Sequence, residues 1–236
     1  WRLIHTHKAY SNNADIESAC VPITPMLDRY RHLLSPTPAT CRPRFLLGSS
    51  LRDKAELSVS CEEQYPTQKR IGIAPFAAHK GKIYPLDKME QVVRLLSEKG
   101  YQILLFGAGK KEREILEQWA DTYPNVTSLA DKQTLEEDLQ TMRSLQLMLT
   151  MDSANMHLAS LVGTRVLSIW GATHPWAGFL GYGQSENDCI QRSIPCRPCS
   201  IYGNRRCQFG NYMCLDIPVK TIVDQVMNAY NESLAI

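Results

Sequence analysis

The chain has 236 residues, with 26 Lys or Arg against 24 Asp or Glu, so its formal net charge at neutral pH is +2. This even balance gives no electrostatic reason to expect a nucleic-acid partner, and the length suffices for a core in one or two domains. No apolar run reaches the roughly 18 residues of a membrane-spanning helix, and WRLIHTHKAY lacks the apolar core of a signal peptide. These features predict a cytoplasmic protein.

The first 69 residues carry turn signals such as SPTPATCRPR and one expected helix around TPMLDRYRHLL, without a sustained period. They open on Trp1 rather than on a strand, a turn and a helix. We therefore expect that part of the gene product precedes this chain. Residues 1–69 are interpreted as an interdomain segment, and residues 70–236 as a separate domain.

From residue 70 onward, short apolar runs alternate with amphipathic stretches. The expected strands are RIGIAPF, YQILLF, NVTSL, QLMLTM and RVLSIW. The expected helices are PLDKMEQVVRLLSEKG, KKEREILEQWADTY, TLEEDLQTMRSL, NMHLASLVG and VKTIVDQVMNAYN. This alternation predicts an α/β fold with a parallel sheet and helices on both faces.

Four polar or glycine-rich segments each follow an expected strand: FAAHKGKIYP, GAGKKE, DSANMH and GATHP. Ligands of open parallel sheets bind outside the carboxyl ends of the strands. Each segment alone is explained as readily by an ordinary turn. The four together predict a binding site at one edge of the sheet.

The segment DSANMH has the features of an anion site. Asp152 directly follows an expected strand, so the next helix would begin with unpaired backbone N–H groups, those of Ser153, Ala154 and Asn155. His157 in the first turn would add a donor, and Lys82 a compact cation. Taken singly, such an aspartate is more often a helix cap, such a histidine a half-buried imidazole and such a lysine a solvated side chain.

Four of the eight cysteines are clustered in PCRPCSIYGNRRCQFGNYMC. A C-x2-C pair followed by two more thiols is a pattern that a tetrahedral zinc ion accepts, but the later gaps are wider than in most zinc sites. Reduced structural thiols and a structural zinc site therefore both remain open. The candidate ligands are Cys196, Cys199, Cys207 and Cys214.

Several ordered motifs carry a family resemblance. MDSANMHLASLVGTRVLSIWGATHP resembles the D-[ST]-G-x-x-H-x-A…FG-x-T-x-P signature of glycosyltransferase family 9, the lipopolysaccharide heptosyltransferases. KIYP resembles the family's K-x-W-P element, ILLFGAGKKE its strand and glycine loop, and the cysteine-bearing tail one seen in many members. The likeness covers roughly residues 71–230.

The resemblance implies a GT-B architecture, in which two Rossmann-like domains face each other across a cleft and this chain supplies the nucleotide-sugar-binding one. Residues 1–69 would then end the acceptor-side domain. The implied donor is ADP-heptose and the implied acceptor a lipopolysaccharide core or related glycolipid. The donor-binding residues carried over by position are Lys82, Gly107, Gly109, Asp152, Ser153, Ala154, His157 and Thr173. Ala154 and Tyr84 depart from the family's usual glycine and tryptophan.

The resemblance also implies inverting transfer, in which a carboxylate deprotonates the acceptor and no metal or other cofactor is required. The family's base is an early aspartate of the acceptor-side domain, and no segment here resembles that region, so the catalytic residue is left unassigned. A lipid-linked acceptor implies peripheral contact with the inner face of the inner membrane.

Two alternatives come from other classes of protein. An NAD-dependent dehydrogenase would use LLFGAGKKERE as its dinucleotide loop and Asp131 on the ribose, but Glu112 replaces the third glycine. A non-catalytic nucleotide-binding or interaction module would explain the cysteine cluster and the lack of a recognisable base.

Overall fold

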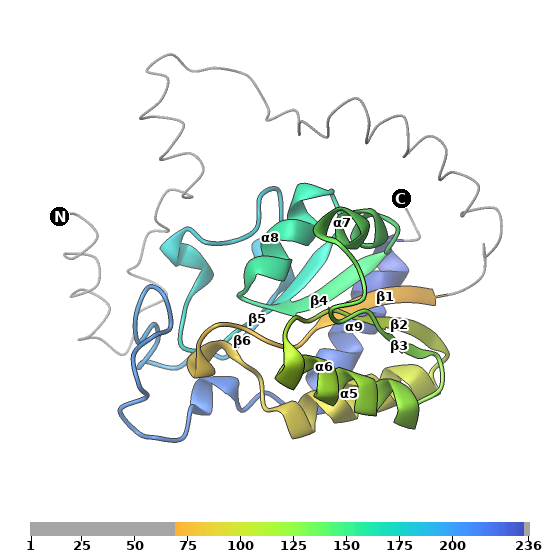
Figure 1. The fold of residues 1–236 in the computed structure, drawn as a ribbon. Coiled ribbons are helices and arrows are strands. Elements are labelled where there is room, and N and C mark those ends of the chain that lie inside the picture. The colour runs from red at the N-terminus through yellow and green to blue at the C-terminus, as the bar shows by residue number, and fades with distance from the viewer. Residues whose placement is uncertain (1–68, 234–236) are drawn as a thin grey trace, which may run out of the picture.

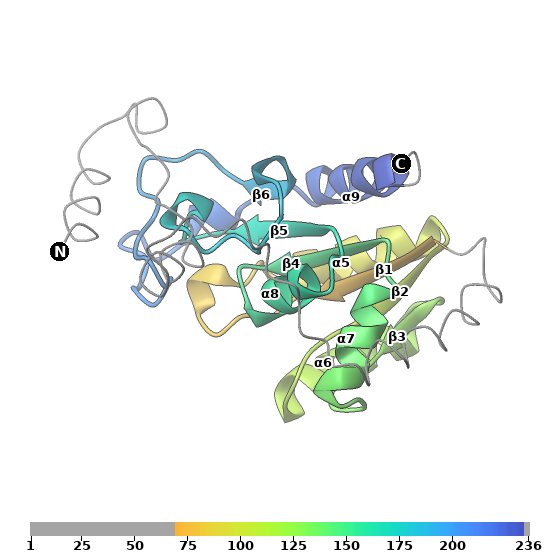
Figure 2. The same cartoon turned by 90° about the horizontal axis from the view of Figure 1, so that it is seen from above.

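The computed structural model describes residues 69–233. In this part the strands form one six-stranded sheet in the order β3-β2-β1-β4-β5-β6, which can be followed across Figure 2. Every pairing is parallel, as the sequence predicted. The strands are β1 (Lys69–Ala74), β2 (Tyr101–Leu105), β3 (Val126–Ser128), β4 (Leu147–Met151), β5 (Val166–Trp170) and β6 (Cys189–Gln191).

Helices cover both faces of the sheet, with α7 and α8 above it and α5 and α6 below it in Figure 1. The α-helices are α5 (Leu86–Glu98), α6 (Lys110–Thr122), α7 (Leu135–Arg143), α8 (Ala154–Leu161) and α9 (Val219–Ser233). Short 3-10 turns are η2 (Lys80–Lys82), η3 (Pro175–Ala177), η4 (Glu186–Asp188) and η5 (Met213–Leu215). The helix expected around TPMLDRYRHLL lies outside the described residues.

The core has two layers because the sheet is buried on both faces. One layer packs α5, α6 and α9 against the sheet, and the other packs α7 and α8 against its opposite face. The apolar stripe predicted for α5 is buried, with Met89, Val92, Val93 and Leu96 all inaccessible to solvent. Strands β4 and β5 are buried along their whole length, as expected for central parallel strands.

The strand order creates a topological switch point between β1 and β4. The chain runs outward from β1 to β2 and β3, then returns to the other side of β1 to build β4, β5 and β6. In such sheets the loops leaving the two strands at the switch point separate and form a crevice at their carboxyl ends. The loop that contains Lys82 follows β1, and Asp152 directly follows β4.

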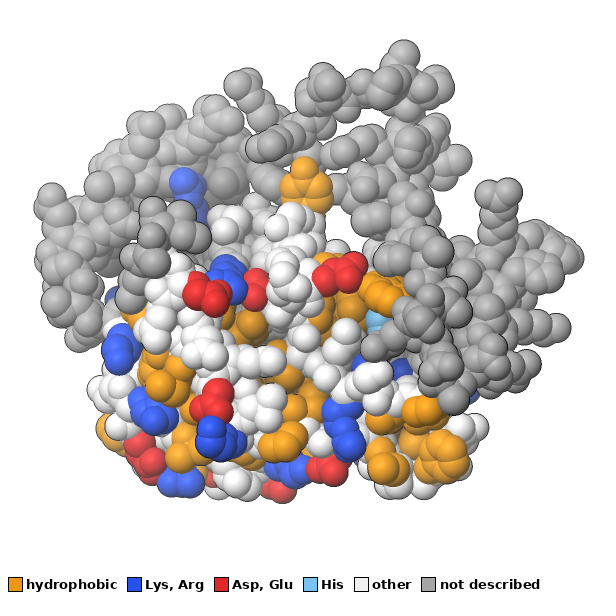
Figure 3. Space-filling view, turned by 180° about the vertical axis from the view of Figure 1, so that it is seen from behind, with side chains coloured by type: hydrophobic (Ala, Val, Ile, Leu, Met, Phe, Trp, Pro, Cys, Tyr) orange, Lys and Arg blue, Asp and Glu red, His pale blue; other side chains and the backbone are white. Residues whose placement is uncertain are grey.

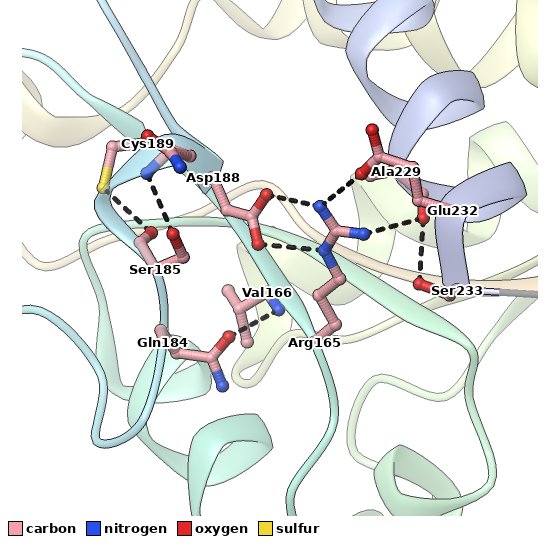
Figure 4. A network of polar contacts seen from close by, with 10 residues as sticks. Arg165, Val166, Gln184, Ser185, Asp188, Cys189, Ala229, Glu232 and Ser233 are labelled. Carbon is pink, nitrogen blue, oxygen red and sulfur yellow. Dashed lines mark hydrogen bonds and ion pairs between the residues drawn. The ribbon is translucent and has the colours of Figure 1, made fainter. Parts of the chain in front are cut away.

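The amino end of β5 is held by Arg165, which Figure 4 shows between β6 and α9. Its guanidinium binds both carboxylate oxygens of Asp188, at 2.7 and 2.9 Å, and reaches α9 through the Ala229 carbonyl and the Glu232 carboxylate, each at 3.0 Å. The hydrogen bonds to Asp188 raise the pKa of Arg165. This network ties the last helix and the sheet edge to the end of β5 opposite the switch-point loops.

Charges of both signs are interspersed over the face shown in Figure 3, in keeping with the near-neutral composition. Among residues 69–233, no helix has both the length and the apolar character needed to cross a bilayer.

Candidate functional site

Loops from three strands meet around the carboxylate of Asp152, which is only 4% exposed. Its Oδ2 accepts a hydrogen bond from Thr173 Oγ1 at 2.7 Å and pairs with Lys82 Nζ at 2.9 Å. Lys82 comes from the loop after β1 and Thr173 from the loop after β5, so the contacts span the switch point. Asp152 therefore does not cap α8 with its side chain. It fixes the position of a cation instead.

The loops after β1 and β5 are also joined through their backbones. The Ala172 N–H donates to the Gly81 carbonyl at 2.8 Å. A side chain at Gly171 would collide with that carbonyl and with Leu215, so this close approach requires glycine. The position of Lys82 is thus fixed by a backbone hydrogen bond at the neighbouring Gly81 as well as by the ion pair with Asp152.

Helix α8 begins next to this ion pair. Its N-cap residue, Ser153, makes no side-chain capping bond, and the Ser153 hydroxyl lies 3.2 Å from Thr150 Oγ1 instead. Ala154 at the first helical position is exposed. Uncapped N–H groups and the positive end of the helix dipole, beside a lysine, form a suitable place for a phosphate.

His157 lies in the first turn of α8, where Asp152 and Lys82 both act on it. Although the residue is exposed overall, desolvation by the surrounding protein lowers the pKa of its imidazole below the usual value. The Lys82 ammonium lowers this pKa further, while the Asp152 carboxylate opposes both effects. The imidazole therefore lies close enough to Lys82 and Asp152 for their charges to affect its pKa, and we expect a bound anion to affect it in the same way.

The glycine loop after β2 is closed by the chain's own carboxylates. The Ala108 N–H donates to Glu112 Oε2 at 3.0 Å, and the Gly109 N–H donates to the carboxylate oxygens of Asp131 at 3.0 and 3.1 Å. A dehydrogenase would turn these N–H groups toward pyrophosphate and keep Asp131 for the ribose. Gly107 and Gly109 do lie at the same sheet edge as Asp152, but this arrangement does not favour the dehydrogenase alternative.

The cysteine-bearing segment brings Cys214 near enough to the other three candidate ligands for their charges to interact. Burial raises the pKa of the Cys214 thiol to about 11, which favours the protonated form. Between residues 69 and 233, no three or more His, Cys, Asp or Glu side chains form a group that could hold a metal ion. The zinc site remains a prediction that this arrangement does not support.

Arg197 is a part of the site that the sequence did not predict. It is 4% exposed, and its guanidinium donates to the carbonyls of Gly171 and Thr173, both at 2.7 Å. The sequence shows only an arginine between Cys196 and Pro198, in a segment interpreted through its thiols. No spacing rule indicates that such an arginine points inward.

Comparison with known proteins places this arrangement in a wider group. The family model described as glycosyltransferase family 9 (heptosyltransferase) matches residues 6–212, which begins well before the region where the motifs were apparent. A lipooligosaccharide heptosyltransferase 2 of Campylobacter jejuni subsp. jejuni serotype O:2 is 26% identical over 152 residues, covering 60% of this chain and 44% of that protein. A lipopolysaccharide heptosyltransferase 3 of Escherichia coli is 31% identical over 118 residues, covering 47% and 35%.

Among solved structures, the fold resembles that of E. coli ADP-heptose lps heptosyltransferase II, with a TM-score of 0.64 and 17% identity. The similarity covers 89% of this chain and 62% of that one. The predicted Rossmann-like architecture of GT-B type is therefore confirmed. The chain spans less than half the length of the two curated relatives.

Proposed function

Since the chain belongs to glycosyltransferase family 9, we propose that residues 70–236 bind a nucleotide-sugar donor, ADP-heptose, for inverting transfer to a lipopolysaccharide core or related glycolipid. The names of the relatives support this choice, because they are heptosyltransferases of lipooligosaccharide or lipopolysaccharide, and one structural neighbour is named for ADP-heptose. A lipid-linked acceptor would bring the protein to the inner face of the inner membrane.

The observation that carries the proposal is the contact of Lys82 with Asp152 beside the uncapped start of α8. A diphosphate bound there would meet the Lys82 ammonium and backbone N–H groups of Ser153 and Ala154. These groups are fixed before the ligand arrives, so they stabilise the negative charge that develops on the leaving nucleoside diphosphate without further reorganisation.

Asp152 itself is a poor candidate for the base in this reaction. Its carboxylate is buried, and its Oδ2 is already bound by both Lys82 and Thr173, so the side chain is held in place rather than presented to an acceptor hydroxyl. We therefore propose that Asp152 positions Lys82, and that the base comes from the acceptor-side domain. Gly107 and Gly109 are proposed to lie beside the nucleoside.

A donor screen tests the proposal. Calorimetric titration of the chain with ADP-heptose and with sugars linked to UDP and GDP should give saturable binding that is strongest for the ADP-linked donor. Preference for another nucleotide would overturn the choice of donor. If no nucleotide binds, the donor-binding role itself is wrong.

A further inference from the structure

Arg197 connects the cysteine-bearing segment to the backbone of the loop after β5. Its Nε donates to the Gly171 carbonyl and its Nη2 to the Thr173 carbonyl, so one guanidinium holds the chain on both sides of Ala172. The same guanidinium also donates to the Arg192 carbonyl, at 2.6 Å, and to Gln191 Oε1, at 3.0 Å. The group thus joins the end of β6 to the end of β5.

The backbone that Arg197 fixes carries one side chain of the ion-pair site. Thr173 accepts from Arg197 through its carbonyl and donates through its hydroxyl to Asp152, which in turn holds Lys82. Hydrogen bonds from a charged donor are stronger than neutral ones, and the planar guanidinium sets the separation of its two acceptors. A series of contacts through Thr173 and Asp152 therefore connects Arg197 to the Lys82 ammonium, so loss of the guanidinium should shift the position of that ammonium.

The same segment approaches Lys82 directly. The Cys199 N–H donates to the Ala172 carbonyl at 2.8 Å, so all three consecutive carbonyls from Gly171 to Thr173 are bound by residues 197–199. Gly203 has a φ of +72°, and a Cβ there would lie 2.7 Å from the aliphatic stem of Lys82. The cysteine-bearing segment therefore forms one wall of the site.

We propose that Arg197 is a positioning residue for the donor diphosphate, acting through Thr173 and Asp152 on Lys82. The proposal rests on the donor-binding role proposed for the Lys82 site. In this proposal the cysteine-bearing segment contributes to donor affinity, because it supplies the Arg197 guanidinium that holds the loop after β5. Arg197 does not touch the donor in this scheme.

The chain offers a matched control in Arg165. Both arginines lie at ends of β5, and both join it to β6 or the segment next to it through buried or half-buried hydrogen bonds. Arg165 lies at the amino end and Arg197 at the carboxyl end, where the site is. Loss of either should destabilise the fold, but only Arg197 should affect donor binding.

The test is calorimetric titration with ADP, well below each variant's melting temperature. Arg197→Gln should raise Kd about tenfold or more, the scale of losing charge-assisted hydrogen bonds, whereas Arg165→Gln should leave Kd within about twofold. Arg197→Lys, which is milder for folding, should still raise Kd about threefold because an ammonium lacks the fork geometry. Wild-type affinity in a folded Arg197→Lys or Arg197→Gln protein would overturn the proposal.

A double-mutant cycle separates positioning from a general loss of order. If Arg197 acts through Lys82, Arg197→Gln should have little further effect on Kd in a Lys82→Met background. If the two fold-changes multiply, the proposed route is wrong. If the wild type binds ADP, and Lys82→Met weakens that binding but Arg197→Gln does not, this inference is wrong and the proposed function stands. Should wild type not bind, the proposed function fails first.

Discussion

At the scale of single residues, the central feature is the buried carboxylate of Asp152, whose two partners, Lys82 and Thr173, come from the loops after two other strands. Asp152 was predicted as part of an anion site, with helix capping as the alternative. The structure brings Lys82 and Thr173 to it and leaves the start of α8 without a side-chain cap. A one-dimensional motif indicates which residues are polar, but it does not show which oxygen each one binds.

The pKa of His157 offers a direct check on this geometry. Desolvation holds it below the usual value, Lys82 lowers it further and Asp152 raises it. Asp152→Asn should therefore lower the pKa, Lys82→Met should raise it, and bound ADP should raise it because phosphate oxygens favour the imidazolium. It follows that ADP affinity increases as the pH falls through the pKa of the bound form. An NMR titration of the imidazole with and without ADP measures all three shifts, and a pKa unmoved by either substitution would contradict the arrangement.

His174 should make folding sensitive to acid. Burial, and then the nearby Arg197 charge, lower its pKa to about 4. The unfolded chain takes up a proton on this imidazole near its ordinary value and the folded chain only near pH 4, so the free energy of unfolding falls as the pH drops through that window. The contribution is about 3 kcal/mol. It should disappear in His174→Asn, which keeps an acceptor for the Trp176 N–H.

Urea denaturation of both proteins at pH 7 and pH 4 isolates this contribution, because the carboxylates of the rest of the chain affect both proteins alike. Equal losses of stability in wild type and His174→Asn would show that the buried imidazole is not responsible.

At the scale of elements, the site depends on how closely the loops after β1 and β5 approach each other. Gly171→Ala should push the Gly81 carbonyl and Leu215 away, destabilise the fold by about 1–3 kcal/mol and weaken ADP binding. Gly72→Ala is the matched control, because its added methyl collides with Met148 and Leu145 in the core layer between the sheet and helices α7 and α8. It should cost similar stability and leave ADP affinity unchanged. Urea unfolding and ADP titration together distinguish the two, and equal affinities in both variants would refute the role of Gly171.

The elements themselves were largely predictable, since each expected strand and helix between residues 70 and 236 is present with small changes at its ends. Hydrophobic periodicity and turn residues were sufficient for this. Strand β6 was missed because only Ile190 of its three residues, Cys189–Gln191, is buried, and because the polar stretch QSEND precedes it. Arg197 was missed for a different reason, since its bonds go to carbonyls 24 and 26 residues earlier in the chain, a distance at which local patterns carry no signal.

At the scale of the whole molecule, binding and transfer make different demands. The donor site that we propose needs only the strand-end loops of one Rossmann-like domain, and the described residues contain those loops. Transfer also needs a positioned base and an acceptor surface, which we place in the facing domain of the GT-B architecture. We therefore predict that residues 1–236 bind ADP-heptose saturably and give no acceptor-dependent ADP release. Robust transfer by this chain with a lipopolysaccharide-core acceptor would show that the base lies within it.

The zinc prediction can be tested on the purified protein as a whole. If the four cysteines hold a metal, the purified protein should contain about one zinc per chain and lose thermal stability on chelation, because metal binding adds to folding free energy. Elemental analysis and thermal melts with and without chelator measure this. Four titratable thiols and a melting temperature indifferent to chelator would show instead that the cysteines are reduced structural thiols.

The most direct test of the account is the affinity of the chain for ADP, measured by calorimetry for wild type, Lys82→Met and the control Lys88→Met. Lys88, in the first turn of α5, forms an exposed ion pair with Asp216 rather than with Asp152. We predict one saturable site, whose affinity for ADP falls about tenfold or more in Lys82→Met and is unchanged in Lys88→Met. An affinity that does not depend on Lys82, or the absence of any binding, would contradict it.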